Sequence, residues 1–267
     1  MADQINTHKV STIISLALSI YANTRYFVGR SPYDHHNPYN VANTPFSGNI
    51  IVTLVFWIVL YIHQILFVTQ IFLPQLENHN DRINITNKIG WHFTVFNLGS
   101  FFWTILFVKK HFFWSELILI INFINVLQLY YIHKTNSIKP LTNWILIHLP
   151  TTALPLSWLV YAIFWNGAVL FNVHKFVGRI VSNVLIWDFL LFGLNFVWLY
   201  NDYAVGLSTS VLTFGLGLGQ LFTRAFALQW IFAFVISGLL FVASILAAFV
   251  GPRRSVVVDE EQAPLLE

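Results

Sequence analysis

The sequence predicts an all-α fold, a polytopic bundle of about eight transmembrane helices. Hydrophobic residues make up 57% of the 267 residues and charged residues only 9%, against roughly 25% charged in an ordinary soluble domain. The apolar residues also gather into stretches of about 20, the length that crosses the hydrocarbon of a bilayer. The formal charge is +3 with no basic cluster, so we expect no nucleic-acid partner.

Eight stretches are long and apolar enough, or nearly so, to span a membrane, and seven to nine spans fit the pattern. They leave residues 1–9 as a short tail, 10–250 as a single bundle and 251–267 as a short acidic tail. The stretches are roughly 10–28, 49–73, 91–108, 112–132, 142–170, 180–200, 203–222 and 226–250.

Two of these stretches are irregular. The first is interrupted by Ser15, Ser19, Asn23 and Arg25, and we interpret it as a retained span because no convincing signal-peptide cleavage site follows. The fifth carries two prolines in HLPTTALPLSW. Proline kinks a helix and frees backbone carbonyls, so this stretch is either one strongly kinked helix or a re-entrant segment followed by a full span.

The polar segments RSPYDHHNPYNVANTPFSG and LENHNDRINITNK are predicted loops between the first three spans. In an eight-span arrangement Lys and Arg divide seven to seven between the two sides, so the positive-inside rule gives no orientation. Asn84-Ile85-Thr86 is a glycosylation sequon, which would place its loop in the lumen if used.

The acidic tail resembles a dileucine sorting signal, in which Glu261 precedes Leu265 and Leu266. Such signals are bound by cytosolic adaptors in endosomal and vacuolar traffic. We therefore expect both termini in the cytosol, with a vacuolar, endosomal or plasma membrane location.

Ionisable groups inside a bilayer are costly, so they are candidates for a functional site. Asp188 lies in the middle of its predicted span, seven residues from Asn195 and therefore on the same helical face. We expect this face to point into the bundle, where it either serves a function or forms a buried hydrogen bond between helices. Glu116, near the start of its span, either joins such a site or faces the interface.

The fourth span carries Asn122, Asn125 and Gln128 at steps of three. We expect these amides to point inward, where they either line a polar cavity or hold helices together.

The seventh span carries a stripe of small residues at Gly206, Ser210, Thr213 and Gly217. Small residues let helices approach closely, so this helix is predicted to be central in the bundle. A Gly-rich transport hinge is the alternative.

No enzyme, metal or cofactor is expected. There is no cysteine, which excludes disulfides, thiol nucleophiles and Cys-ligated zinc or iron–sulfur clusters. The ten His are scattered, and no HExxH, G-x-S-x-G, Walker or G-x-G-x-x-G motif occurs.

Two resemblances follow from particular motifs. The loop ANTPFSGNI before a Trp-containing span, the segment HLPTTALPLSW and the NDY hairpin after the sixth span resemble an uncharacterised fungal family of multi-spanning membrane proteins, which implies no known activity. Residues 45–110 are also similar to the tryptophan-rich sensory (translocator) proteins, binders of porphyrins and sterols. Trp57 with Tyr61 and Trp103 with Phe107 carry that similarity, although Asn97 lies six residues before Trp103 instead of three.

Three functions are compatible with these features. The first is transport of a small lipophilic or polar solute, or control of membrane permeability, along a path lined by the polar residues of the spans. The second is a membrane receptor or sensor for a lipophilic molecule, with an apolar pocket of Trp and Tyr. The third is a structural membrane protein whose partners are mainly lipids.

Overall fold

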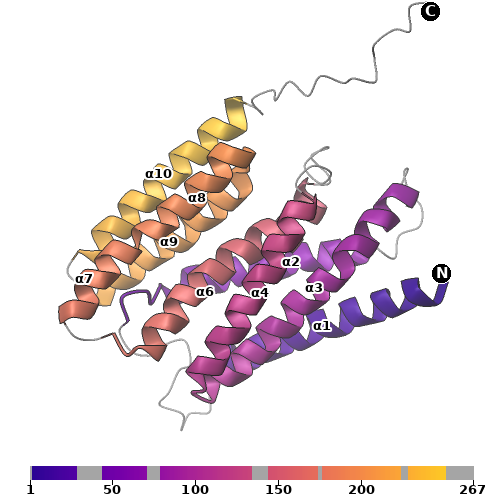
Figure 1. The fold of residues 1–267 in the computed structure, drawn as a ribbon, viewed down its shortest axis with the longest axis horizontal. Coiled ribbons are helices and arrows are strands. Elements are labelled where there is room, and N and C mark those ends of the chain that lie inside the picture. Colours follow the sequence, from indigo (N-terminus) through magenta and orange to yellow (C-terminus); the bar gives the residue numbers. More distant parts are fainter. Residues whose placement is uncertain are drawn as a thin grey trace, which may run out of the picture.

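The computed structural model describes residues 2–28, 44–70, 79–133, 144–173, 176–223 and 228–250, and these form an all-α bundle (Figure 1). Its helices, in chain order, are α1 (Ala2–Val28), α2 (Ile50–Gln70), α3 (His79–Val108), α4 (Phe112–His133), the π-helix η2 (Trp144–Ala153), α6 (Leu154–Leu170), α7 (Phe176–Leu185), α8 (Trp187–Tyr200), α9 (Tyr203–Thr223) and α10 (Gln229–Val250).

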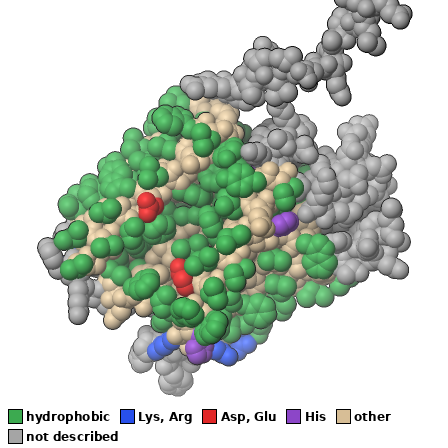
Figure 2. Space-filling model, viewed as in Figure 1, with side chains coloured by type: hydrophobic (Ala, Val, Ile, Leu, Met, Phe, Trp, Pro, Cys, Tyr) green, Lys and Arg blue, Asp and Glu red, His purple; other side chains and the backbone are tan. Residues whose placement is uncertain are grey.

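Seven spans in the described part of the chain are long and apolar enough to cross a membrane. They are Ile50–Thr69, Ile89–Val108, Phe112–Ile132, Trp144–Leu170, Val177–Tyr200, Tyr203–Phe222 and Gln229–Phe249. Figure 2 shows the corresponding surface, on which hydrophobic side chains cover most of the visible described face and two acidic patches lie among them.

Helix α1 does not meet the same apolar criterion, although it is long enough, and its polar residues explain why. Ser15, Ser19 and Asn23 are buried against the bundle, whereas Val10 and Ile14 are exposed. The Asn23 amide donates to the Tyr61 hydroxyl of α2 at 2.7 Å. Polar groups inside and apolar groups outside are the arrangement of a lipid-facing helix, so α1 has the surface of an eighth span.

The helices form two groups joined through the middle of the molecule (Figure 1). Helices α1, α3 and α4 lie side by side at one edge, and α8 and α10 pack on α9 at the other. Between them, α6 contacts both α4 and α9, while α2 contacts η2 and α9. The two most buried spans are accordingly Trp144–Leu170 and Tyr203–Phe222.

The fifth stretch is one helical span that changes from a π-helix to an α-helix after Ala153, so it is a single helix and not a re-entrant segment followed by a full span. The π-helix η2 contains Pro150 and continues directly into α6. Three carbonyls near the break accept side-chain hydrogen bonds: Ile147 from Thr151 at 2.6 Å, His148 from Thr152 at 2.6 Å, and Pro150 from Gln64 of α2 at 3.4 Å. Side chains of this span and of α2 thus supply hydrogen bonds to backbone carbonyls around Pro150.

One predicted boundary was wrong. Helix α3 begins at His79, so the sequon Asn84–Thr86 lies in a helix and not in a loop. Local polar residues suggested a loop there from sequence, whereas the helix extends beyond its apolar part. The predicted sixth span is present as Val177–Tyr200, with a one-residue irregularity at Ile186 between α7 and α8.

The segment Thr44–Asn49 packs closely against α9 before α2 begins. The Gln220 amide donates to the Thr44 and Ser47 carbonyls at 2.8 and 2.9 Å. The backbone N–H of Asn49 donates to the Gly215 carbonyl at 2.8 Å, and the Asn49 side chain caps the first turn of α2. This ordered entry fixes α2 to the centre of the bundle.

Candidate functional site

The most polar buried contact in the described chain joins the broken fifth span to the start of α9. His148 Nε2 of η2 lies 2.8 Å from Asp202 Oδ2, and the two side chains are only 2% and 1% exposed. Burying an ionisable pair this completely carries a large desolvation cost. Such pairs are also enriched at functional sites, so this contact is the candidate site.

The local sequence determines where Asp202 lies. Asn201 ends α8 in a left-handed conformation with φ 53°, which asparagine tolerates better than most residues. Asp202 Oδ1 then accepts hydrogen bonds from the Ala204 and Val205 amides at 3.0 and 3.3 Å. Asp202 is thus the N-cap of α9, and its second oxygen remains available for His148.

Both ring nitrogens of His148 have a polar partner within hydrogen-bond distance. The Thr152 hydroxyl donates its single hydrogen to the His148 carbonyl at 2.6 Å and lies 3.0 Å from His148 Nδ1. With that hydrogen used, its lone pairs face Nδ1, while Nε2 faces the Asp202 carboxylate. The contact with Asp202 is an ion pair when both ring nitrogens carry a proton.

Tyr130 of α4 completes the cluster. Its ring packs against His148 at 6.0 Å and edge-on against Phe196 at 4.8 Å. Its buried hydroxyl lies near Asp202 without forming a hydrogen bond of ordinary geometry. Burial alone raises the pKa of Asp202, but the charge of His148 and the hydrogen bonds around the carboxylate outweigh burial and hold this pKa below its usual value.

The cluster has the order hydroxyl, imidazole, carboxylate, which also occurs in hydrolases. Thr152 is only 3% exposed, and its hydrogen is directed at a backbone carbonyl. The arrangement is better suited to holding charge and helices together than to attacking a substrate. If either charge were lost, the contact between η2 and α9 would weaken.

Sequence reasoning missed this site. His148 and Asp202 are 54 residues apart, so no local spacing connects them. The one available signal was Asp202 itself, because an Asp just before an apolar run is a typical N-cap. An acid at that position, followed by a central helix, indicates a carboxylate at the edge of the buried core.

The expected inward orientation was wrong for Asn195, and Asp188 is only partly turned inward. Both lie on α8, where Asp188 is half-buried and Asn195 is exposed. Leu191, between them on the same face, is 65% exposed. Helix α8 packs on α9 and α10 through its other face, so this stripe points outward.

The amides of α4 connect this helix to α3 and do not extend to Asp188. Asn122 donates to the Phe96 carbonyl at 3.0 Å, and Asn125 exchanges hydrogen bonds with His92. Gln128 is exposed, so its expected inward orientation was wrong. Each step of three residues falls about 60° short of a full turn, which carries the third amide out of the interface.

Glu116 belongs to a separate polar cluster at the start of α4. The Asn166 amide of α6 donates to Glu116 Oε2 at 2.7 Å, and the Ser115 hydroxyl donates to Asn166 Oδ1 at 2.7 Å. Glu116, Asn122 and Asn125 therefore hold pairs of helices together, and the polar residues selected from sequence do not line one common path.

Most of the small-residue stripe of α9 contacts α10. The Ser210 and Ser237 hydroxyls each donate to the other residue's carbonyl, at 2.8 and 2.9 Å. A Cβ atom at Gly217 would lie 2.9 Å from the Phe234 ring, and one at Gly206 would meet Ser244. Thr213 bonds within its own helix.

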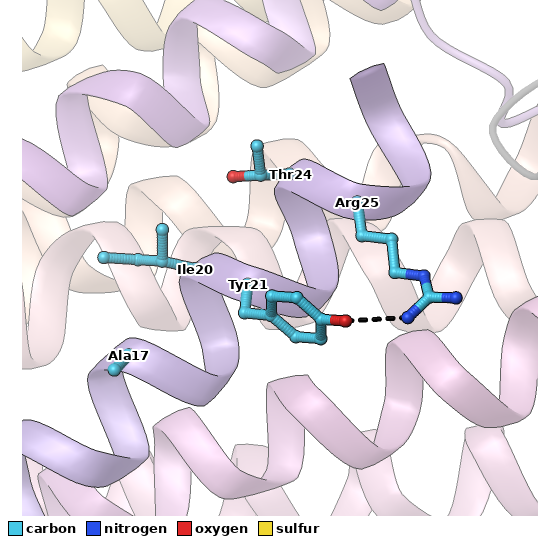
Figure 3. A pocket seen from close by; sticks show the side chains of 5 residues that line it. All are labelled: Ala17, Ile20, Tyr21, Thr24 and Arg25. Atoms are coloured by element: carbon cyan, nitrogen blue, oxygen red, sulfur yellow. Dashed lines mark hydrogen bonds between the residues drawn. The ribbon is translucent and has the colours of Figure 1, made fainter. Parts of the chain in front are cut away.

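The aromatic residues fill the space between the helices with their own rings. Trp158 packs edge-on against Trp57 at 4.8 Å and Trp103 at 6.0 Å, and Tyr61 lies 5.1 Å from Trp57. Figure 3 shows a surface hollow lined by Ala17, Ile20, Tyr21, Thr24 and Arg25, all on α1. Arg25 donates to the Tyr21 hydroxyl at 2.7 Å there. A hollow beside a single helix is not an enclosed aromatic site.

No three His, Asp or Glu side chains within the described ranges are grouped to hold a metal ion. The candidate sorting residues Glu261, Leu265 and Leu266 lie outside the described residues.

Together these features define an all-α bundle whose apolar helices are suited to a membrane. Residues 179–266 match a family described as fungal protein of unknown function (DUF1774). An uncharacterized protein of Schizosaccharomyces pombe (strain 972 / ATCC 24843) is 39% identical over 90 residues, which are 33% of this chain and 34% of the relative. The chain therefore matches about a third of the length of that relative. No solved structure matches the chain.

The matched family region contains Asp202 and the helices α8, α9 and α10, but not His148. The resemblance to an uncharacterised fungal family is thus supported for the C-terminal third, and the family itself carries no activity to assign.

Proposed function

We propose that this chain is a non-enzymatic, multi-pass membrane protein that lets a small solute cross its bilayer, and that the His148–Asp202 pair controls the opening. The observation that carries this proposal is a buried ion pair at the joint of a broken span. Transporters commonly use discontinuous helices at the place where they bind and open.

The physical basis is a two-state contact. While both groups are charged, His148 holds η2 against the N-terminus of α9. Protonation of the carboxylate or loss of the imidazolium proton removes the attraction and leaves a buried polar group with an incomplete partner, which favours separation. Because η2 continues into the central helix α6, its separation from α9 would open the middle of the bundle.

The supporting features lie on both sides of this contact. Pro150 breaks the fifth span, so η2 is able to move relative to α6. The N-terminal cap of α9 depends on the same carboxylate, so a change at the pair reaches the helix directly. Solute, surrounding lipids and cytosolic adaptors at the C-terminal tail are the partners of this proposal, in a vacuolar, endosomal or plasma membrane with both termini cytosolic.

The test is flux through vesicles containing the purified full chain. Glycerol entry, followed by light scattering, and proton entry, followed by a trapped pH dye, probe an uncharged solute and the coupling ion. We expect flux above that of protein-free vesicles, and Asp202→Asn and His148→Gln, which remove the attraction that keeps the contact closed, should raise it about tenfold. Gln128→Leu, at an exposed amide of α4, is the matched control and should leave flux unchanged.

Two results would contradict the proposal. Vesicles with the wild-type chain that pass neither probe faster than empty ones would favour a structural membrane protein. Flux that is unchanged in both pair variants would remove the His148–Asp202 contact from the opening step.

A further inference from the structure

An outward face of α8 carries polar groups that the rest of the described chain leaves without partners. The Asp188 carboxylate and the Asn195 amide form no hydrogen bond or ion pair with any described residue. Both lie in the span Val177–Tyr200, where the surroundings of an outward residue are hydrocarbon. An acid and an amide in that position are costly, so their exposure requires an explanation.

These two residues belong to a regular seam. Asp188, Leu191, Asn195 and Trp198 follow one another at spacings of three, four and three residues. This is the a and d pattern of helices that pair along a left-handed seam. Leu191 is 65% and Trp198 is 84% exposed, so the apolar members of the seam are available for packing.

The seam continues into α7 with the same spacing. Val177, Val181 and Val184 extend it toward the N-terminal end of the span, and all three are exposed. A face with a heptad spacing over the whole span is matched in length to another membrane helix. Its polar members, Asp188 and Asn195, are a full heptad apart, at equivalent positions of the repeat.

Self-complementarity selects the partner. A carboxamide has both donors and acceptors, so Asn195 is able to pair with Asn195 of a second copy across a two-fold axis. Two Asp188 carboxyl groups brought together in the same way share a proton and form a hydrogen bond. Copies inserted in the same orientation are related by an axis along the membrane normal, which brings identical residues of parallel helices together.

We propose that this face of α7 and α8 is the dimer interface of the protein, with Asn195 and Asp188 pairing with their counterparts in a second copy. The surface is separate from the His148–Asp202 contact, and the proposal does not depend on the transport function. It assigns a role to the two intramembrane polar residues that the bundle itself does not use.

The chain contains no cysteine, so single-cysteine variants can be crosslinked without first replacing native cysteines. Leu191→Cys, at a central seam position, should form a disulfide-linked dimer when native membranes are oxidised. Ile124→Cys on α4 and Leu239→Cys on α10 are matched controls, since these residues are also about half-exposed apolar positions, 48% and 50%. They should remain monomeric under the same oxidation.

Second-site variants test the polar pairs. In the Leu191→Cys chain, Asn195→Leu should weaken dimerisation about tenfold, the effect of one amide pair between membrane helices. Asp188→Asn preserves hydrogen bonding and removes the need for a shared proton, so crosslinking should persist. The thermal unfolding midpoint of each variant checks that the fold is intact, which we expect because both residues lie outside the core.

The proposal is overturned if Leu191→Cys gives no more dimer than the two controls, or if Asn195→Leu leaves its crosslinking unchanged. Crosslinks from Leu191→Cys only to other proteins would overturn it as well, in favour of a different helical partner on the same seam.

Discussion

At the scale of single residues, Asp202 shows how one carboxylate serves two elements. Its Oδ1 atom caps α9 through two backbone amides, and its Oδ2 atom pairs with His148. Asparagine also caps helices well, which separates the two roles experimentally. An Asp-to-Asn change retains the cap and removes the charge, whereas an Asp-to-Ala change removes both.

We therefore expect Asp202→Asn to lower the free energy of unfolding by about 1–3 kcal/mol, because His148 loses its charged partner in a buried position. Asp202→Ala should cost about 1 kcal/mol more, the usual contribution of an N-cap. Thermal or denaturant unfolding in detergent measures both. Equal losses in the two variants would show that the cap contributes nothing, and an unchanged Asp202→Asn protein would exclude a stabilising ion pair.

The same residue predicts a pH dependence. Burial works to raise the pKa of Asp202, but the charge of His148 and the surrounding hydrogen bonds lower it below the ordinary value in the folded protein. A carboxyl of this kind contributes stability that is fully present above its unfolded pKa, about 3.9. That contribution is lost as the pH falls through the lower folded value.

The unfolding temperature of the wild type should therefore decrease below about pH 4, and more steeply than that of Asp202→Asn, which has no carboxyl to protonate. A pH series of both proteins in one detergent tests this expectation. Parallel curves for the two proteins would contradict it.

At the scale of elements, α9 is central because its small residues admit several neighbours. Gly219 contacts the backbone of the segment before α2, where an added Cβ would lie 2.6 Å from the Gly48 carbonyl carbon and 2.7 Å from the Ser47 oxygen. Backbone atoms held by Gln220 are unable to yield as a flexible side chain would.

Gly219→Ala should consequently destabilise the protein by about 1–3 kcal/mol, the usual cost of overpacking. Gly238→Ala on α10 is the matched control, since nothing lies within 4 Å of its added Cβ. That change should be neutral or stabilise the helix by up to about 1 kcal/mol. The free energy of unfolding of both variants, measured under the same conditions, tests this prediction. An equal effect of the two changes would argue against close packing at Gly219.

Elements were predictable from sequence where they depend on local composition, and less so where they depend on contacts. Apolar length identified the helices, and Pro150 identified the break in the fifth span. The start of α3 at His79 was not predictable from apolar length, because a helix extends beyond its hydrophobic part without any change in hydropathy. The outward turn of Asp188 depends on how α8 packs on α9 and α10, which no local pattern records.

At the scale of the whole molecule, α1 decides the topology. Seven spans in the described chain are long and apolar enough to cross a membrane. Helix α1 is less apolar because it carries polar residues such as Ser19 and Asn23, which are buried against the bundle. The sequence showed these residues as interruptions of an apolar run. Only the structure shows that they pair with Tyr61 of α2, which leaves the apolar side of α1 for lipid.

With α1 included, the described residues contain an even number of spans, so both ends of the bundle should lie on the same side of the membrane. The chain contains no cysteine, so each variant has a single thiol. Ala2→Cys places it before the spans and Ser255→Cys places it after them. A membrane-impermeant maleimide added to sealed vesicles of one orientation should label both variants or neither. Labelling of one variant alone means an odd number of spans, and α1 would then lie along the surface or the fifth stretch would cross in a different way. Labelling of both variants in inside-out vesicles, whose outer surface is the cytosolic face, would further agree with the cytosolic placement that the acidic tail suggests. Adaptors recognise such signals only on that face.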